Sequence, residues 1–255
     1  MGNVTQLKQG KRYSEEEWQL RVDLAAAFRL AAAFDWHESV ANHFSCAVSP
    51  DGKKFLMNPL WQHFSTVKAS DLLLLDSDDP GTMKRPNAPD PSAWCIHGAI
   101  HRRLPQARVV LHLHPVYATA LAALKDPDVK PIDQNTARYY NRLAIDLEYG
   151  GIADDQAEGE RIIRVLGNKS RMMMGNHGLL VTANTVADAF EDMYYLERAC
   201  RTLMIAYASG QPLNLMSHEI AEKVAVGWET YLGMAPAFFT QMKKKLDATD
   251  PSYAQ

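Results

Sequence analysis

Residues 109–116, Val-Val-Leu-His-Leu-His-Pro-Val, are the stretch that decides the fold. An apolar run rich in valine and leucine that stops at a proline is typical of a buried strand followed by a helix. His112 and His114 are two residues apart, so on a strand their imidazoles project from the same face. Pro115 places both at the carboxyl end of the strand, where open α/β sheets hold their ligands. Two interpretations remain for this pair alone: two metal ligands, or two hydrogen-bonded histidines at a strand end.

A third histidine lies in a second, similar setting. His177 belongs to Gly-Asn-His-Gly at residues 175–178, a turn between short apolar strands at 172–174 and 179–182. Catalytic zinc usually has three protein ligands and an open position, and His177 can supply the third. The alternative is a turn histidine that points to water. Three imidazoles suit Zn, Mn, Fe or Co, so we predict one divalent ion per chain, with zinc as the first choice.

The flanking sequence alternates between helical and strand patterns. Helices are expected over 15–34, 92–104, 162–166 and 186–208, with two more between 218 and 246, after which a polar tail (247–255) is expected to be loose. Further strands are expected at 43–49, 54–57 and 72–75, whereas residues 77–91 form a loop and 125–160 have a mixed pattern. Strands interspersed with helices predict one α/β domain, a three-layer α/β/α sandwich.

Composition excludes several classes of function. The chain has 255 residues, 27 basic and 30 acidic side chains, and a formal net charge of −3, so neither nucleic acid nor a membrane surface is an expected partner. The three cysteines show no disulfide or metal-binding spacing, which favours the reduced cytoplasm. The N-terminus lacks the apolar core of a signal peptide.

Three segments together resemble the class II aldolase/adducin family. They are Trp-Cys-Ile-His…Val-Val-Leu-His-Leu-His-Pro (94–115), Met-Met-Met-Gly-Asn-His-Gly-Leu-Leu-Val (172–181) and Phe-Leu-Met-Asn-Pro…Ala-Ser-Asp-Leu-Leu-Leu-Leu-Asp (55–76). The resemblance covers roughly residues 15–210, with C-terminal helices (211–246) beyond it. It implies a central, mainly antiparallel sheet, a metal held by the three histidines, a small-molecule substrate and a homotetramer.

The resemblance also implies carbon–carbon lyase chemistry, but the family's catalytic glutamate is missing. Aldolases of the family carry it one residue before a tryptophan, and here Ala93 precedes Trp94. Alanine cannot transfer a proton. His97 lies four residues later, on the same face of the expected helix, and could act as general acid or base. It could equally pack beneath the metal strand, and His101 is expected at the surface or behind the site.

Other polar residues are weaker candidates for the site. Tyr139 and Tyr140 could donate a proton and Arg138 could bind a carboxylate, although all three could instead lie between subunits. Asp90 is a further candidate for the missing acid. Where the family's sugar-phosphate enzymes grip phosphate, this chain has bulky residues at 58–61 (Asn-Pro-Leu-Trp), so the substrate is expected to carry no phosphate. The polar residues left as candidates for substrate binding are Ser45, Asn58 and Ser70.

Two functions from different classes fit this sequence. The first is a metal-dependent lyase that cleaves a carbon–carbon bond, by decarboxylation or in an aldol-type reaction, in a small hydroxy-carbonyl or carboxylate compound. The second is a non-catalytic, adducin-like binding or scaffold protein, which the loss of the glutamate favours. The intact histidine triad favours the enzyme.

Overall fold

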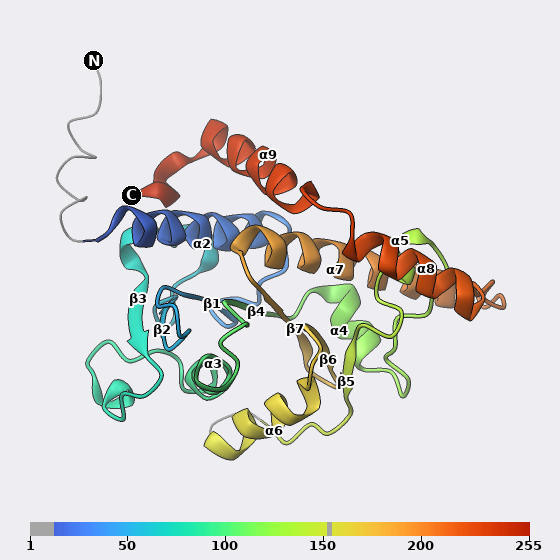
Figure 1. Ribbon diagram of the computed structural model, residues 1–255, viewed down its shortest axis with the longest axis horizontal. Coiled ribbons are helices and arrows are strands. Elements are labelled where there is room, and N and C mark those ends of the chain that lie inside the picture. Colours follow the sequence, from blue (N-terminus) through green and yellow to red (C-terminus); the bar gives the residue numbers. More distant parts are fainter. Residues whose placement is uncertain (1–12, 152–154) are drawn as a thin grey trace.

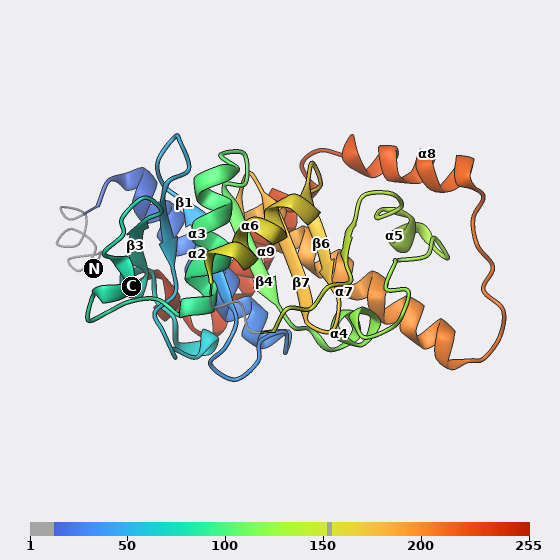
Figure 2. The same ribbon diagram turned by 90° about the horizontal axis from the view of Figure 1, so that it is seen from below.

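The computed structural model describes residues 13–151 and 155–255 as an α/β fold built around a seven-stranded sheet (Figures 1 and 2). The order of the strands in the sheet is β3-β2-β1-β4-β7-β6-β5. The strands are β1 (His43–Ala47), β2 (Lys54–Met57), β3 (Leu73–Asp76), β4 (Val109–Leu113), β5 (Ala144–Asp146), β6 (Arg171–Met174) and β7 (Gly178–Ala183).

The helices include all those expected from the sequence. The α-helices are α2 (Glu15–Ala33), α3 (Pro91–Arg103), α4 (Val116–Ala122), α5 (Gln134–Ala137), α6 (Gln156–Leu166), α7 (Val186–Ala208), α8 (His218–Glu229) and α9 (Met234–Thr249). Short 3-10 helices are η1 (Phe64–Thr66), η2 (Ala69–Asp71), η3 (Thr82–Lys84) and η4 (Pro251–Ala254). None of the described helices combines the length and apolar character needed to cross a membrane.

The sheet is mixed, so the expectation of a mainly antiparallel sheet is corrected. Strand β5 runs parallel to β6, whereas the other neighbouring strands are antiparallel. Parallel neighbours need a crossover connection, and the segment that contains α6 supplies it. The residues of β5 lie in the stretch that gave only a mixed pattern in the sequence.

Apolar side chains cover both faces of the sheet. Val109, Leu111 and Leu113 of β4 belong to the large core cluster that includes the buried faces of α2 and α7. Val110 of the same strand belongs to a second cluster with residues of α3 and α6. Figure 1 shows α2 and α7 on one side of the sheet, with α9 outside them, and α3 and α6 on the other. His112 alternates with its neighbours and therefore faces the α3 side.

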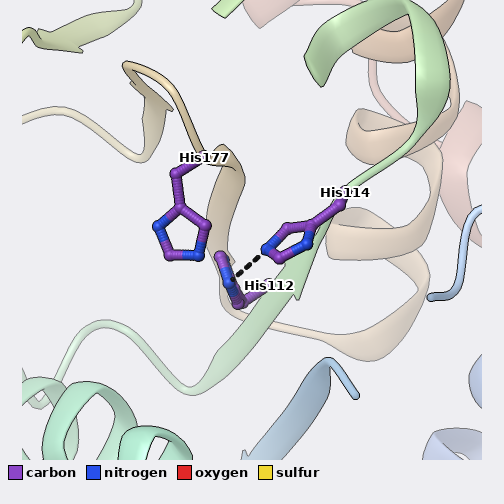
Figure 3. A group of neighbouring side chains, drawn as sticks. All are labelled: His112, His114 and His177. Atoms are coloured by element: carbon purple, nitrogen blue, oxygen red, sulfur yellow. Dashed lines mark hydrogen bonds between the residues drawn. The ribbon is translucent and has the colours of Figure 1, made fainter. Parts of the chain in front are cut away.

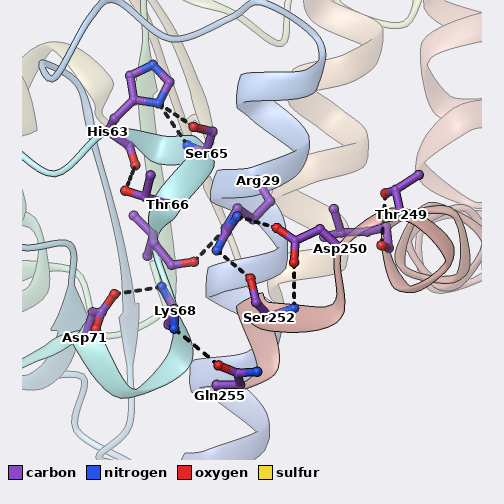
Figure 4. A network of polar contacts seen from close by, with 12 residues as sticks. Arg29, His63, Ser65, Thr66, Lys68, Asp71, Thr249, Asp250, Ser252 and Gln255 are labelled. Atoms are coloured by element: carbon purple, nitrogen blue, oxygen red, sulfur yellow. Dashed lines mark hydrogen bonds and ion pairs between the residues drawn. The ribbon is translucent and has the colours of Figure 1, made fainter.

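The C-terminal residues pack against the body, so the expectation of a loose tail is wrong. Tyr253 in η4 is buried. Arg29 of α2 donates to Asp250 Oδ2 (2.9 Å) and to Ser252 Oγ (3.1 Å), and Lys68 Nζ donates to Gln255 Oε1 (3.2 Å), as Figure 4 shows. These contacts bring the two ends of the described chain together, because α2 is its first helix.

Candidate metal centre

His112, His114 and His177 meet at the end of β4, next to the turn between β6 and β7. Each offers one ligand nitrogen, and these nitrogens all lie within 4.8 Å of one another. The ring centroids are 4.7–4.9 Å apart, and Figure 3 shows the rings around a common point. Antiparallel pairing of β4 with β7 brings the two segments together, with Leu113 opposite Leu179.

The outer nitrogens of two of these rings already have partners. His112 Nδ1 lies 2.9 Å from the carbonyl oxygen of Leu179, and His114 Nδ1 contacts the carboxylate of Glu38. Such contacts fix which nitrogen remains for a metal, in both cases Nε2. The two Nε2 atoms are 3.1 Å apart. Two nitrogens on a tetrahedral ion, each roughly 2.0–2.1 Å from it, are about 3.3 Å apart, so the donor set fits a divalent cation such as zinc.

Two glycines let the His177 turn approach the neighbouring strands. A Cβ atom added to Gly178 would lie 2.5 Å from His114 Cδ2 and 2.5 Å from the carbonyl oxygen of Leu113. One added to Gly175 would lie 2.7 Å from the carbonyl oxygen of Asp146. Real carbon contacts need about 3.5 Å. Glycine is therefore required at both positions by close packing.

Burial keeps the imidazoles of His112 and His177 neutral. Desolvation, followed by the neighbouring His177, lowers the pKa of His112 well below its ordinary value. Desolvation, followed by His114, lowers the pKa of His177 to about 4. Neutral imidazole is the form that binds a metal, so these rings need not lose a proton at neutral pH.

A cavity of about 270 Å³ opens onto the three histidines. Polar residues in its lining include His43, Asn42, Asn58, Asp90 and Ser92. Its apolar side is formed by Val40, Pro59, Leu60, Trp61 and Ile96, together with the ring of Tyr149. The lining of the cavity therefore combines a cluster of imidazoles with apolar side chains.

His97 lies behind this cavity and reaches it through His43. His97 Nε2 is 2.8 Å from His43 Nδ1, and His97 Nδ1 is 2.6 Å from Ser45 Oγ. Ser45 Oγ is also 2.7 Å from Nε2 of His101, which is fully buried rather than at the surface. The ring of His43 stacks on that of His112 with centroids 4.9 Å apart. The side chains of His101, Ser45, His97 and His43 therefore form one buried chain of hydrogen bonds, which ends beside the candidate metal ligand His112.

Helix α3 begins at Pro91, one residue before the expected start. Asp90 caps the helix, because its Oδ1 accepts from the backbone N–H groups of Ser92 (2.9 Å) and Ala93 (3.1 Å). Pro91 occupies the first helical position, where proline is tolerated. Ala93 is buried, and Asp90 is the carboxylate that lines the cavity.

Besides His97 and Ser45, which lie behind the cavity, four predicted site residues lie away from the histidine cavity within this chain. Tyr139 is buried and donates to the backbone oxygen of Asp192 (3.0 Å), whereas the hydroxyl of Tyr140 is 3.0 Å from His218 Nδ1. Arg138 binds Glu191 through both terminal nitrogens, at 2.9 and 2.6 Å. Ser70 is exposed, and its N–H donates to the carbonyl of Gln255 (2.9 Å). A role in the site for Tyr139, Tyr140, Arg138 and Ser70 stays a prediction.

Spacing along the chain gave no argument for three of the residues that line the cavity: His43, Asn42 and Trp61. His43 lies directly opposite His112 in the pairing of β1 with β4, and this register cannot be read from spacing along the chain. Asn42 and Trp61 both have positive φ values, +70° and +58°. Asparagine before a strand is an available signal for such a conformation, but tryptophan is not.

Fold and site together define an α/β protein with a three-histidine cluster at a strand end, and the comparisons agree with that class. The sequence profile of the Class II Aldolase and Adducin N-terminal domain matches residues 22–204. A Caulobacter vibrioides protein named "Putative aldolase class 2 protein" is 34% identical over 248 residues, which are 95% of each chain. The chain therefore belongs to the class II aldolase and adducin family.

Two further relatives illustrate the breadth of the family. An aldolase II superfamily protein from Pseudomonas syringae has a crystal structure that superposes with a TM-score of 0.87 at 32% identity, over 97% of this chain and 100% of that one. The decarboxylase NovR of Streptomyces niveus is 27% identical over 228 residues, 86% of this chain and 83% of NovR. Lyases are thus among the relatives, as are proteins named for adducin.

Proposed function

We propose that this chain is a metal-dependent lyase that cleaves a carbon–carbon bond in a small, non-phosphorylated hydroxy-carbonyl or carboxylate compound, by decarboxylation or in an aldol-type reaction. The observation that carries the proposal is the convergence of three imidazole nitrogens within 4.8 Å beside a cavity. His112, His114 and His177 would hold one divalent ion, with zinc preferred and Mn, Fe or Co as alternatives. A bound ion of this kind acts as a Lewis acid on a carbonyl or carboxylate oxygen.

The buried histidine chain supplies a candidate for the proton-handling role that Ala93 cannot fill. His43 lines the cavity, and with its Nδ1 engaged by His97 it has Nε2 left for a substrate. His97 does not line the cavity, so we assign it the role of positioning His43. Asn58, which also lines the cavity, is the candidate for substrate binding that the structure supports most directly. Ser45 would act indirectly, because it bonds to His97.

Assembly and location are part of the same proposal. We propose a homotetramer, and the exposed apolar residues around α8, including Tyr231 and Leu232, supply a surface for contacts between copies. Cys46 and Cys200 are buried thiols, which suits the reducing cytoplasm.

The test is metal content by mass spectrometry on protein purified without added metal. The wild type should carry about one ion per chain and His112→Ala should lose it, because two imidazoles make a weak site. His218→Ala is the matched control, since this histidine bonds to Tyr140 outside the cavity and its loss should leave the metal content unchanged.

Activity is then measured on the loaded protein as release of CO₂ or of a carbonyl product from hydroxy acids and keto acids. Turnover that disappears in His112→Ala supports the lyase. A wild-type protein that cannot be loaded with Zn or Mn contradicts it and favours the adducin-like binding function, for which the loss of the glutamate at Ala93 is the supporting observation.

A further inference from the structure

Trp61 forms an exposed aromatic wall at the mouth of the histidine cavity. Its side chain is 74% exposed although it lines the cavity, and it makes no ring contact with another residue of the described chain. Its φ angle is +58°, a conformation that is a genuine outlier for a bulky residue. Such an angle persists only where the surrounding structure enforces it, and such positions concentrate at functional sites.

The turn that carries Trp61 is anchored on both sides. Before it, Asn58 Oδ1 accepts from the N–H of Phe44 in β1 (3.3 Å), and Asn58 Nδ2 donates to the carbonyl of Asn42 (3.4 Å). After it, Gln62 Nε2 donates to Asp71 Oδ2 (2.7 Å). The backbone that carries the indole is therefore fixed before any ligand arrives, which lowers the entropy lost when this turn is ordered on binding.

The charge of the cavity argues against a phosphorylated ligand. None of the described residues that line it is lysine or arginine, and Asp90 adds a carboxylate. A phosphate dianion would have neither a cationic side chain nor a helix N-terminus free to receive it, because Asp90 already caps α3. The side chains of Val40, Leu60, Trp61 and Ile96 instead offer apolar contact.

One buried polar group in the cavity lacks a partner. The side chain of Asn42 is only 5% exposed, and neither its Oδ1 nor its Nδ2 has a hydrogen-bond partner in the described structure. A buried amide left unpaired is unfavourable, so this group needs a ligand or water. Asn42 therefore adds an unmet hydrogen-bonding group to the lining of the cavity that also holds the three histidines.

We propose that the cavity binds a 2-hydroxy or 2-keto acid with an aromatic side chain, whose ring lies against Trp61 while its oxygens face the histidines and Asn42. This inference rests on the proposed metal-dependent function and specifies its substrate class. Trp61 is then the residue that determines specificity, and its contribution is confined to ligands that carry a ring.

Three probes that differ only at carbon 3 test the proposal: lactate, 3-phenyllactate and 3-phosphoglycerate, which share the 2-hydroxy acid group. Their affinities are measured by calorimetry on the metal-loaded full chain. Phenyllactate should bind roughly tenfold more tightly than lactate, since stacking on an aromatic ring adds to the burial of apolar area. Trp61→Ala should remove most of this gain and leave lactate within about twofold, whereas Trp61→Phe should keep most of it. Met83→Ala, a change at another exposed apolar residue that lies outside the cavity, is the matched control.

The outcomes separate this inference from the proposed function. If lactate binds to the loaded protein but phenyllactate gains nothing, or phosphoglycerate binds most tightly, the aromatic assignment is overturned and the metal centre stands. The assignment is also overturned if Trp61→Ala loses the same affinity for lactate as for phenyllactate. It is likewise overturned if Trp61→Ala changes the oligomeric state and leaves the affinity for phenyllactate unchanged. A protein that takes up no metal and binds none of the probes overturns both.

Discussion

The substitution Gly178→Ala tests whether close packing against the β6–β7 turn sets the geometry of the histidine cluster. The added Cβ would lie 2.5 Å from His114 Cδ2 and 2.5 Å from the carbonyl oxygen of Leu113. Normal carbon contacts are about 3.5 Å, so the turn and β4 must separate by about 1 Å. Metal ligands tolerate displacements of only about 0.2 Å. We expect metal affinity to fall about 10- to 100-fold, as it does when a ligand loses its support, and stability to fall by about 1–3 kcal/mol.

Metal affinity is measured by competition with a chelator, and the free energy of unfolding by urea titration. Gly227→Ala is the control, because a Cβ there meets nothing within 4 Å. It lies inside α8, so alanine should stabilise the protein by up to about 1 kcal/mol without changing metal affinity. If Gly178→Ala binds metal within about twofold of the wild type and unfolds at the same urea concentration, the packing explanation is refuted.

Three further substitutions test buried groups away from the metal ligands. Burial raises the pKa of Glu197 from its ordinary value of 4.5 to about 7. The contribution of Glu197 to stability should therefore be complete below pH 4.5 and lost as the pH rises through about 7. As the pH rises, Glu197→Gln should thus become more stable than the wild type, by up to about 3 kcal/mol. The measurement is urea unfolding of both proteins from pH 4 to 8. Arg138→Met leaves Glu191 buried without its bidentate partner and should lower the free energy of unfolding by about 3–5 kcal/mol. Adding Glu191→Gln to this variant should restore part of the loss. If the single variant Arg138→Met and the double variant are equally stable, the result counts against a buried ion pair. Tyr253→Ala should lower stability by about 3 kcal/mol in thermal unfolding if the C-terminus is docked, and by almost nothing if it is loose.

Local sequence patterns predicted the long elements of the fold but not the short or distant contacts. The helix over 186–208 has the bounds expected from its amphipathic pattern, and the structure adds a cap at Thr185. Strand β5 was missed because it has three residues, too few for a pattern, and its parallel pairing depends on a crossover. The docked C-terminus was missed because the polar residues there form hydrogen bonds with Arg29. Its partner Asp250 is 221 positions away, a separation that local patterns do not cover.

The candidate site divides in the same way. The spacing of His112 and His114 on a strand places two imidazoles together by local geometry alone, and the structure brings the third histidine to them. His43 could not be placed, because its position opposite His112 depends on the register of two strands far apart in sequence. His97 is buried on α3, and its hydrogen bond directs it to His43 rather than to the cavity, so a direct catalytic role for it stays a prediction.

Backbone strain and an unmet hydrogen-bonding group coincide at this cavity, and this bears on the choice between enzyme and scaffold. Of the six described non-glycine residues with positive φ, Asn42 and Trp61 line the cavity and Asn176 precedes His177. Asn42 is also buried without a hydrogen-bond partner. Each feature is unfavourable for the folded state by itself, and a protein selected only for assembly would gain nothing by keeping them together beside three converging imidazoles. Their grouping therefore favours a cavity that binds a ligand over a surface used only for assembly, in spite of the alanine at position 93.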